Sequence, residues 1–147
     1  MLHVPLHQLD PDLPVPTYAR SGDAGADLLA RMDTVVPARG GRVLVPTGVA
    51  VAIPPGYAGL VLPRSGLALR HGITCLNAPG LIDAGYRGEL QVILVNHDQS
   101  DDYVVHRGDR IAQLVIVAVE QASFALVDVD GLGQADRGTG GFGHTGA

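Results

Sequence analysis

The chain has 147 residues, of which 46% are hydrophobic, and its formal net charge is −5. This length accommodates one domain with a substantial core, and the apolar content excludes a chain that is disordered over most of its length. The acidic balance disfavours binding to nucleic acid, which needs a basic surface, and no apolar run reaches the roughly 18 residues of a membrane span, so we expect neither partner.

β-strand patterns dominate the chain. Stretches rich in Val, Ile and Leu alternate with Gly, Pro and Asn, which is typical of short strands joined by tight turns. Such stretches occupy residues 42–54, 57–63, 90–96 and 110–120. The stretch SGLALRHG, residues 65–72, predicts a short helix that Ser65 caps at its start and Gly72 ends. No long amphipathic helix and no repeat is evident, so the pattern indicates an all-β sandwich, jelly roll or barrel.

The last twenty residues, DVDGLGQADRGTGGFGHTGA, have a different character. They contain seven of the twenty glycines and few apolar groups, so they can bury little surface. We expect a β core over residues 1–127 and a flexible arm over residues 128–147. Arg137, Phe142 and Thr145 are unusual choices for a plain linker.

The sequence also bears on the cellular compartment. The first ten residues, MLHVPLHQLD, lack the basic and apolar regions of a signal peptide. The single cysteine, Cys75, has no partner in the chain for a disulfide, which suits a reducing environment. We therefore expect a cytoplasmic protein with Cys75 in its core, because this residue lies in the apolar stretch ITCL.

Five glycine-containing segments punctuate the β framework. They are SGDAGADL (21–28), PRSGLALRHGI (63–73), GLIDAGYRGEL (80–90), RGDRIAQL (107–114) and RGTGGFGHTG (137–146). Each segment joins glycines to Asp, Arg, Ser or Gln. Glycine-rich turns expose backbone N–H groups that can surround phosphate oxygens, and arginine grips phosphate with two parallel hydrogen bonds.

These five segments, in this order, resemble the trimeric dUTP diphosphatase (dUTPase) family from about residue 21 to the C-terminus. PRSGLA and IDAGYRGE are especially similar to the family pattern. The resemblance implies a distorted β jelly roll with one short helix and a homotrimer whose active sites are shared between subunits. It implies Mg²⁺-dependent hydrolysis of dUTP to dUMP and pyrophosphate, which supplies dUMP for thymidylate synthesis and keeps uracil out of DNA.

The third segment carries the residue expected to act on water. In isolation, Asp83 would be an ordinary turn aspartate. Within the family pattern it is a general base that orients a water molecule for attack on the α-phosphorus, and it also contacts the 3′-hydroxyl. The resemblance places the Tyr86 ring against the deoxyribose, where it excludes a 2′-hydroxyl, although a half-buried strand tyrosine is the alternative.

The same hairpin is expected to read the base. The resemblance implies that backbone groups of the hairpin, including those of Gly80 and Ile82, imitate a pairing partner of uracil. Asn77 lies at the uracil end of this hairpin or is an ordinary turn asparagine.

The second and fourth segments are expected to bind phosphate. If a helix begins at Ser65, its N-terminal N–H groups, including that of Gly66, suit the α- and β-phosphates together with Arg64. The alternative is that Ser65 only caps the helix and Arg64 pairs on the surface. Gln113, a polar residue in an apolar strand, either contacts a phosphate and assists catalysis or stabilises a β-bulge.

The first segment is expected to contribute to Mg²⁺ binding. Mg²⁺ prefers oxygen ligands and keeps several waters, so the substrate phosphates would hold most of it. Asp27 resembles the acidic residue of the family that lies near this ion and contacts it through water. Asp23 fits turn chemistry better.

The arm is expected to close over the substrate. Phe142 has no core to join and is placed to stack on the base. The resemblance puts Arg137, in a catalytic role, over the phosphates with Gly143, His144 and Thr145. Many family members carry a small hydroxyl residue at the position of His144, so either its ring or only its backbone contributes.

Two alternative functions were weighed. A dCTP deaminase-like enzyme would need a carboxylate acting near the base, and the hairpin segment places no glutamate there. A nucleotide-sensing or protein-binding module could lose the arm or the general base, and this sequence retains both.

Overall fold

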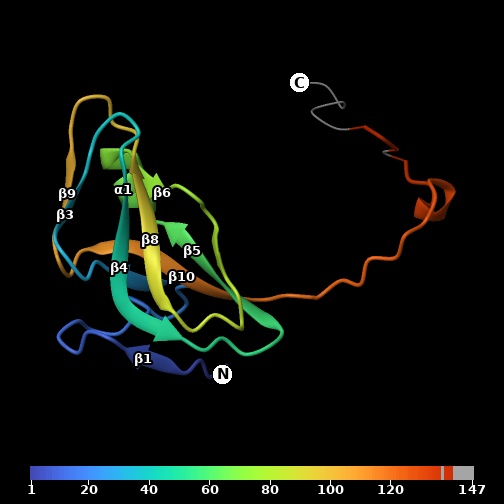
Figure 1. The fold of residues 1–147 in the computed structure, drawn as a ribbon, viewed down its shortest axis with the longest axis horizontal. Helices are drawn as coiled ribbons and strands as arrows, with labels where there is room; N and C mark the ends of the chain where they lie inside the picture. The colour runs from blue at the N-terminus through green and yellow to red at the C-terminus, as the bar shows by residue number, and fades with distance from the viewer. Residues whose placement is uncertain (137, 141–147) are drawn as a thin grey trace.

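The computed structural model describes residues 1–136 and 138–140. The chain forms short antiparallel strands joined by turns, one α-helix and one 3₁₀ turn (Figure 1). In chain order these elements are β1 (Leu6–Gln8), β2 (Ala26–Leu29), β3 (Thr34–Val36), β4 (Arg42–Val51), β5 (Tyr57–Pro63), α1 (Ser65–His71), β6 (Ile73–Cys75), β7 (Gly80–Ile82), β8 (Glu89–Asn96), β9 (Tyr103–Val105), β10 (Arg110–Ala118) and η1 (Asp130–Leu132). The expected all-β class with one short helix is confirmed.

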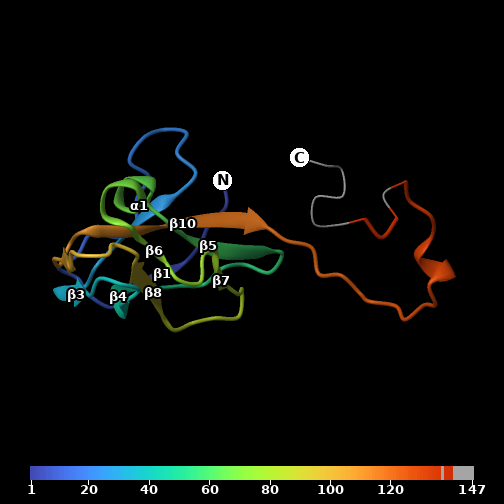
Figure 2. The same cartoon turned by 90° about the horizontal axis from the view of Figure 1, so that it is seen from above.

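Two four-stranded sheets face each other across the core (Figures 1 and 2). One sheet has the strand order β1-β4-β8-β6, the other has the order β2-β10-β5-β7, and β3 pairs separately with β9. Consecutive strands thus alternate between layers, as in a jelly roll, and the sheets remain open rather than closing into a barrel.

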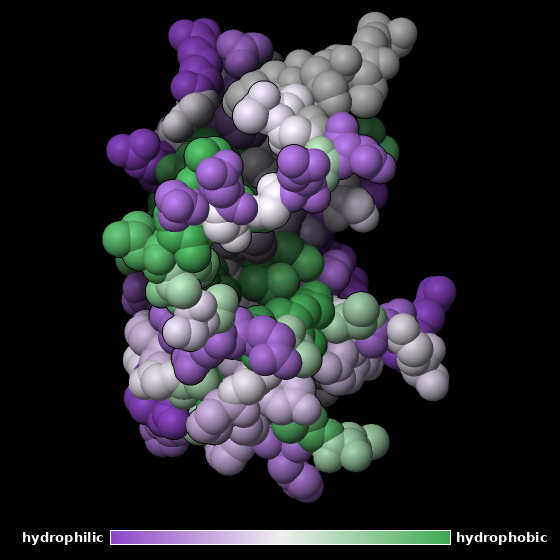
Figure 3. All heavy atoms as spheres, turned by 90° about the vertical axis from the view of Figure 1, so that its right-hand side faces the viewer, coloured by the Kyte–Doolittle hydropathy of each residue, from purple (hydrophilic) through white to green (hydrophobic). Residues whose placement is uncertain are grey.

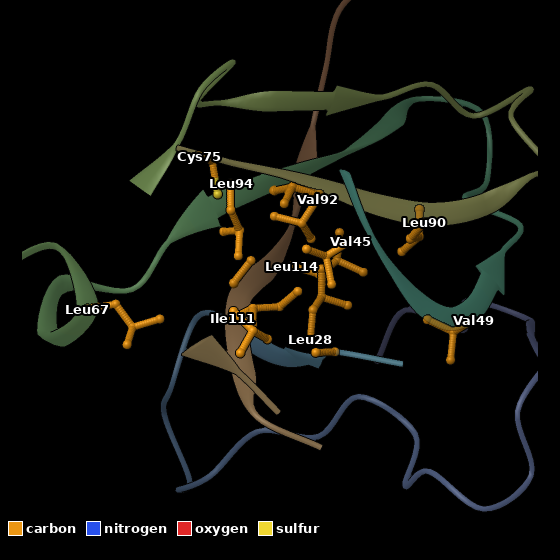
Figure 4. Close-up of a cluster of buried hydrophobic side chains, with 14 of the residues drawn as sticks. Leu28, Val45, Val49, Leu67, Cys75, Leu90, Val92, Leu94, Ile111 and Leu114 are labelled. Carbon is orange, nitrogen blue, oxygen red and sulfur yellow. The ribbon is translucent and has the colours of Figure 1, made fainter. Parts of the chain in front are cut away.

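The core lies between the inner faces of these two sheets (Figure 4). Leu90, Val92 and Leu94 alternate along β8 with more exposed neighbours, and Ile111 and Leu114 face them from β10. Period-2 alternation of this kind is what buries one face of a strand. Other members are Leu28, Val45, Val49, Leu67 and Cys75. Burial raises the pKa of the Cys75 thiol to about 11, which agrees with the expected core position.

The helix differs from its prediction at one end. Helix α1 ends at Gly72, which has a left-handed φ of 63° and donates its N–H to Ala68, as expected for a glycine cap. The prediction that Ser65 caps the start is wrong, because the capping position is Arg64, which makes no side-chain capping bond. Ser65 is instead the first helical residue, and Leu67 docks the helix into the core.

The C-terminal segment leaves the sheets after β10. The Val119 N–H still donates to the Gly56 carbonyl, but every residue from 118 to 136 is exposed. Figures 1 and 2 show this segment running far from the sheets, and Figure 3 shows apolar surface on the side from which it leaves. Phe124 and Leu126, 95% and 102% exposed, are apolar side chains that pack against no core among the described residues. Within the described residues, no helix has the length and apolar character needed to cross a membrane.

Asn96 is a fully buried polar residue at the end of β8. Its Nδ2 donates to the carbonyls of Val36 (3.1 Å) and Asp101 (2.9 Å), and its Oδ1 accepts from the Asp98 N–H (2.9 Å). One side chain thus joins β3, β8 and the loop that leads to β9.

We expect Asn96→Leu to lower the free energy of unfolding by at least about 2 kcal/mol, because buried backbone groups lose their partners. Urea denaturation measures the change. Gln99→Ala is the matched control: its exposed side chain donates to the His97 carbonyl in the same loop. Equal stability of the two variants would contradict this account of the loop.

Candidate active site

The structure brings the predicted site residues together in two groups rather than one. Asp27, Arg64 and Gln113 line one cavity of about 400 Å³, here called the arginine pocket. Asn77, Ile82, Asp83 and Tyr86 line another of about 280 Å³, here called the hairpin pocket. The two pockets have no lining residue in common.

Strand register builds the arginine pocket. Strand β10 lies between β2 and β5, so that Gln113 is opposite Asp27 on one side and opposite Leu62 on the other. Arg64 directly follows β5 and therefore reaches the same place. A slip of one residue in β10 would move Gln113 to the opposite face of the sheet.

The charges in this pocket are arranged around one carboxylate. Asp27 lies 3.6 Å from Nε of Arg64 and 3.5 Å from Nη1 of Arg110. Arg64 also donates from Nη1 to the Arg110 carbonyl (2.9 Å), whereas its buried Nε has no hydrogen-bond partner among the described residues. The pocket thus presents two cations, one amide and the carboxylates of Asp23 and Asp27, and the N–H groups of its arginines could donate to a bound anion.

Gly25 is a position in the first glycine-containing segment where a close contact requires glycine. A Cβ on Gly25 would lie 2.7 Å from Oε1 of Gln113 and 3.0 Å from its Cβ. Only glycine lets the Gln113 side chain lie against this backbone. Asp23 accepts a hydrogen bond from the Arg20 N–H (2.8 Å), in keeping with its expected turn role, and it also lines the pocket.

Arg110 is a pocket residue that the sequence reading missed. On a regular strand, Arg110 and Gln113 would point to opposite faces because they are three positions apart. The register of β10 shifts between Arg110 and Ala112, and this bulge brings both side chains to the pocket. Its position in RGDRIAQL was the available signal, but a β-bulge was considered in this segment only as an alternative role for Gln113.

The hairpin pocket is shaped by the loop between β7 and β8. The Tyr86 N–H donates to the Asp83 carbonyl (3.0 Å), which closes a turn, and the Tyr86 hydroxyl donates to the Glu89 carbonyl (2.9 Å). Arg87 donates from Nη1 to the carbonyls of Ala84 and Tyr86, at 2.6 and 2.7 Å. The loop is held by its own bonds, and Asp83 lines the cavity beside it.

Gly88 in this loop allows the Tyr86 ring to lie close to the backbone. A Cβ on Gly88 would be 2.4 Å from the Tyr86 hydroxyl oxygen and 2.7 Å from Cζ of the same ring. A Cβ on Gly80, at the other side of the hairpin, would be 3.3 Å from Nδ2 of Asn77. Close approach of side chains to the backbone, rather than turning alone, explains these two glycines.

A third hollow, of about 640 Å³, lies where the hairpin loop meets the start of the C-terminal segment. Asp83 lines it together with Tyr57, Glu120 and Gln121. Asp83 therefore faces both the hairpin pocket and the region from which the C-terminal segment departs. Ser65 and Gly66 follow Arg64 in α1. The predicted arm residues Arg137, Phe142, Gly143, His144 and Thr145 lie outside the described residues.

Comparison with known proteins shows the family to which this chain belongs. The family model described as dUTPase matches residues 12–146. A deoxyuridine 5′-triphosphate nucleotidohydrolase of Thermobifida fusca is 57% identical over 145 residues, which cover 99% of this chain and 79% of that protein. A mutant dUTPase of the staphylococcal phage 80alpha has a TM-score of 0.87 at 27% identity, covering 97% of this chain and 98% of that one. A mutant dUTPase from phage phi11 of S. aureus, described with a coordinated structural Mg(II) ion, has a TM-score of 0.78 at 28% identity, covering 86% and 97%.

The family match, over a β sandwich of the same fold, places this chain among the nucleotide hydrolases. The chain belongs to the dUTPase family, and the resemblance drawn from the five segments is confirmed. Membership makes this protein a hydrolase that acts on the triphosphate of dUTP.

The Tyr86 ring gives a stability test of the hairpin loop. We expect Gly88→Ala to displace this ring and to lower the free energy of unfolding by about 1–3 kcal/mol, because the new methyl group overpacks the loop. Gly85→Ala is the matched control, since a Cβ there meets nothing within 4 Å. Urea denaturation measures the free energy of unfolding of both variants. Equal values would show that the position of the Tyr86 ring does not depend on Gly88.

Proposed function

We propose that each pocket binds one half of dUTP and that Asp83 activates the water that attacks the α-phosphorus. The observation that carries this proposal is the chemical division of the two cavities. One holds two arginines and an amide next to Asp23 and Asp27, a set that suits a triphosphate with its Mg²⁺, and the other holds a carboxylate, a tyrosine and an asparagine, which suit a nucleoside. The products would be dUMP and pyrophosphate.

At the phosphate end, Arg64 and Gln113 would stabilise the negative charge that develops as the α-phosphorus is attacked. Ser65 and Gly66, at the first turn of α1, would add N–H groups next to Arg64. Arg137 of the arm would complete the cationic set. The pairing of β10 with β2 already places Gln113 beside Asp27.

The donor set fits a Mg²⁺ ion that the substrate brings with it. Among the described residues, no three His, Cys, Asp or Glu side chains gather to hold a metal. Asp27 is the carboxylate of the arginine pocket, and its oxygens already face Arg64 and Arg110, so contact through water suits it better than direct ligation. When bound to the phosphates, Mg²⁺ would withdraw electron density from them and ease attack on phosphorus.

At the nucleoside end, Asp83 would orient a water molecule and accept its proton. The Tyr86 ring, held by its bond to the Glu89 carbonyl, would lie against the deoxyribose and exclude a 2′-hydroxyl. Asn77 and the backbone of Gly80 and Ile82 would read uracil, with Phe142 of the arm stacked on the base.

Assembly into a homotrimer with shared sites accounts for the separation of the pockets. One chain would contribute its hairpin pocket and a second its arginine pocket, while the arm, residues 128–147, would close the site from another subunit. Exposed Phe124 and Leu126 support this assembly, because apolar side chains on an extended segment require burial elsewhere. The buried thiol Cys75 suits the reducing cytoplasm, where this reaction would supply dUMP for thymidylate synthesis and keep uracil out of DNA.

The general base is tested by Asp83→Asn. This variant should fold and bind dUTP but release pyrophosphate at least about 100-fold more slowly, because the amide cannot accept the proton of water. Pyrophosphate release measures turnover, and calorimetry with the non-turning-over variant measures binding. Wild-type protein incubated with dCTP should release no ammonia, which separates this function from deamination. Near-normal turnover by folded Asp83→Asn would refute the role of Asp83.

A further inference from the structure

Four charged side chains form a continuous chain from the N-terminal segment to the start of β8. Arg107 donates to both oxygens of Asp10, Nε of Arg31 lies 3.4 Å from Oδ2 of Asp10, and Nη1 of Arg31 lies 3.3 Å from Oε1 of Glu89. The signs alternate and sum to zero. The two carboxylates are largely buried, with side chains 12% and 17% exposed. The hydrogen bond from Arg107 holds the pKa of Asp10 at about 2, so this carboxylate stays ionised at neutral pH.

Glu89 has a specific reason to be charged and buried at this place. The β4–β8 register shifts between Pro46 and Ala50, and Gly48, within this irregularity, has a left-handed φ of 76°. An irregularity of this kind takes backbone groups out of the sheet ladder. The Gly48 N–H donates instead to Oε1 of Glu89 (2.8 Å), and Arg31 neutralises the carboxylate that serves it.

The backbone of Glu89 faces the other way, toward the hairpin loop. Its carbonyl accepts the hydrogen bond of the Tyr86 hydroxyl (2.9 Å), and the ring of Tyr86 lies across Gly88. A single residue therefore ties the tyrosine to strand β4: its carbonyl holds the ring, and its carboxylate is fixed on Gly48.

We propose that Glu89 is a positioning residue that sets the place of the Tyr86 ring and thereby the selectivity of the enzyme for deoxyribose over ribose. Arg31 acts as the counter-ion that makes the buried carboxylate tolerable. This inference rests on the proposed function, in which Tyr86 excludes the 2′-hydroxyl. It adds that the exclusion depends on an acidic side chain that does not touch the substrate.

The test is the selectivity ratio, kcat/KM for dUTP divided by kcat/KM for UTP, measured together with thermal stability. Glu89→Ala keeps the backbone carbonyl that accepts from Tyr86 but releases this residue from Gly48, so it should lower the ratio by up to about fivefold, the effect of losing one ordinary hydrogen bond completely. Glu89→Gln keeps an acceptor for the Gly48 N–H and should recover most of the ratio. Tyr86→Ala should lower the ratio further, and Glu89→Ala added to Tyr86→Ala should change it no more.

The control is Arg107→Gln, which breaks the far end of the charge chain but leaves the contacts of Glu89 with Arg31 and Gly48 intact. It should reduce stability at neutral pH, by a difference that shrinks as the pH falls from 3.8 toward about 2, and it should leave the ratio unchanged. If Glu89→Ala fails to fold, Tyr86→Phe carries the test, because it removes only the hydroxyl that reaches the Glu89 carbonyl and should lower the ratio by a similar factor.

The outcomes separate the two proposals. If Tyr86→Ala lowers the ratio but Glu89→Ala and Tyr86→Phe do not, Tyr86 excludes ribose without help from Glu89, and the inference is wrong. An equal effect of Glu89→Ala with and without the Tyr86 ring would also overturn it. If Tyr86→Ala leaves the ratio unchanged, the proposed role of Tyr86 itself fails, and the positioning role falls with it.

Discussion

The phosphate-binding side of this protein depends on the register of one strand. Strand β10 pairs with β2 and β5 at once, so a single alignment places Gln113 beside Asp27 and brings both near Arg64. The alternation that buries Ala112 and Leu114 in the core on either side of Gln113 also fixes this register, because a slip would expose the apolar side chains. Core packing and the geometry of the arginine pocket are therefore set by the same residues.

The separation of the two pockets has an electrostatic consequence. If Asp83 lay beside Arg64 and Arg110 in the free chain, the guanidinium groups would pair with it and compete with the water it is proposed to activate. Asp27 takes that place instead and lies within ion-pair distance of both arginines. In the proposed assembly, cations and general base meet only across an interface, where the triphosphate can neutralise the cations.

The sequence predicted well the elements whose hydrophobic pattern extends over seven or more residues. Strand β5 has its predicted bounds, β8 and β10 differ by a residue or two, and the helix ends at Gly72 as expected. Strands of three or four residues, such as β6 and β7, were not predicted, because so short a stretch has no measurable periodicity and is defined by its partners.

Site residues that lie in family segments could be predicted from the sequence. Site residues whose positions depend on tertiary contacts could not. Asp83, Tyr86 and Asn77 were expected together and line one cavity. Arg110 depends on a bulge, and Glu89 depends on Gly48, which lies 41 residues away in sequence, so no local pattern marks either one. The division into two pockets is likewise a property of the folded chain, since the segments themselves carry no distances.

The central claim is that one active site combines the hairpin pocket of one chain with the arginine pocket of another. Mixed oligomers of Asp83→Asn and Arg64→Ala test it most directly, because each variant inactivates a different pocket. Pyrophosphate release should be low for either variant alone and should rise well above their sum after co-refolding, since some sites then combine two intact pockets. Strictly additive activity, in samples whose mixed oligomers are verified by native mass spectrometry, would contradict the claim.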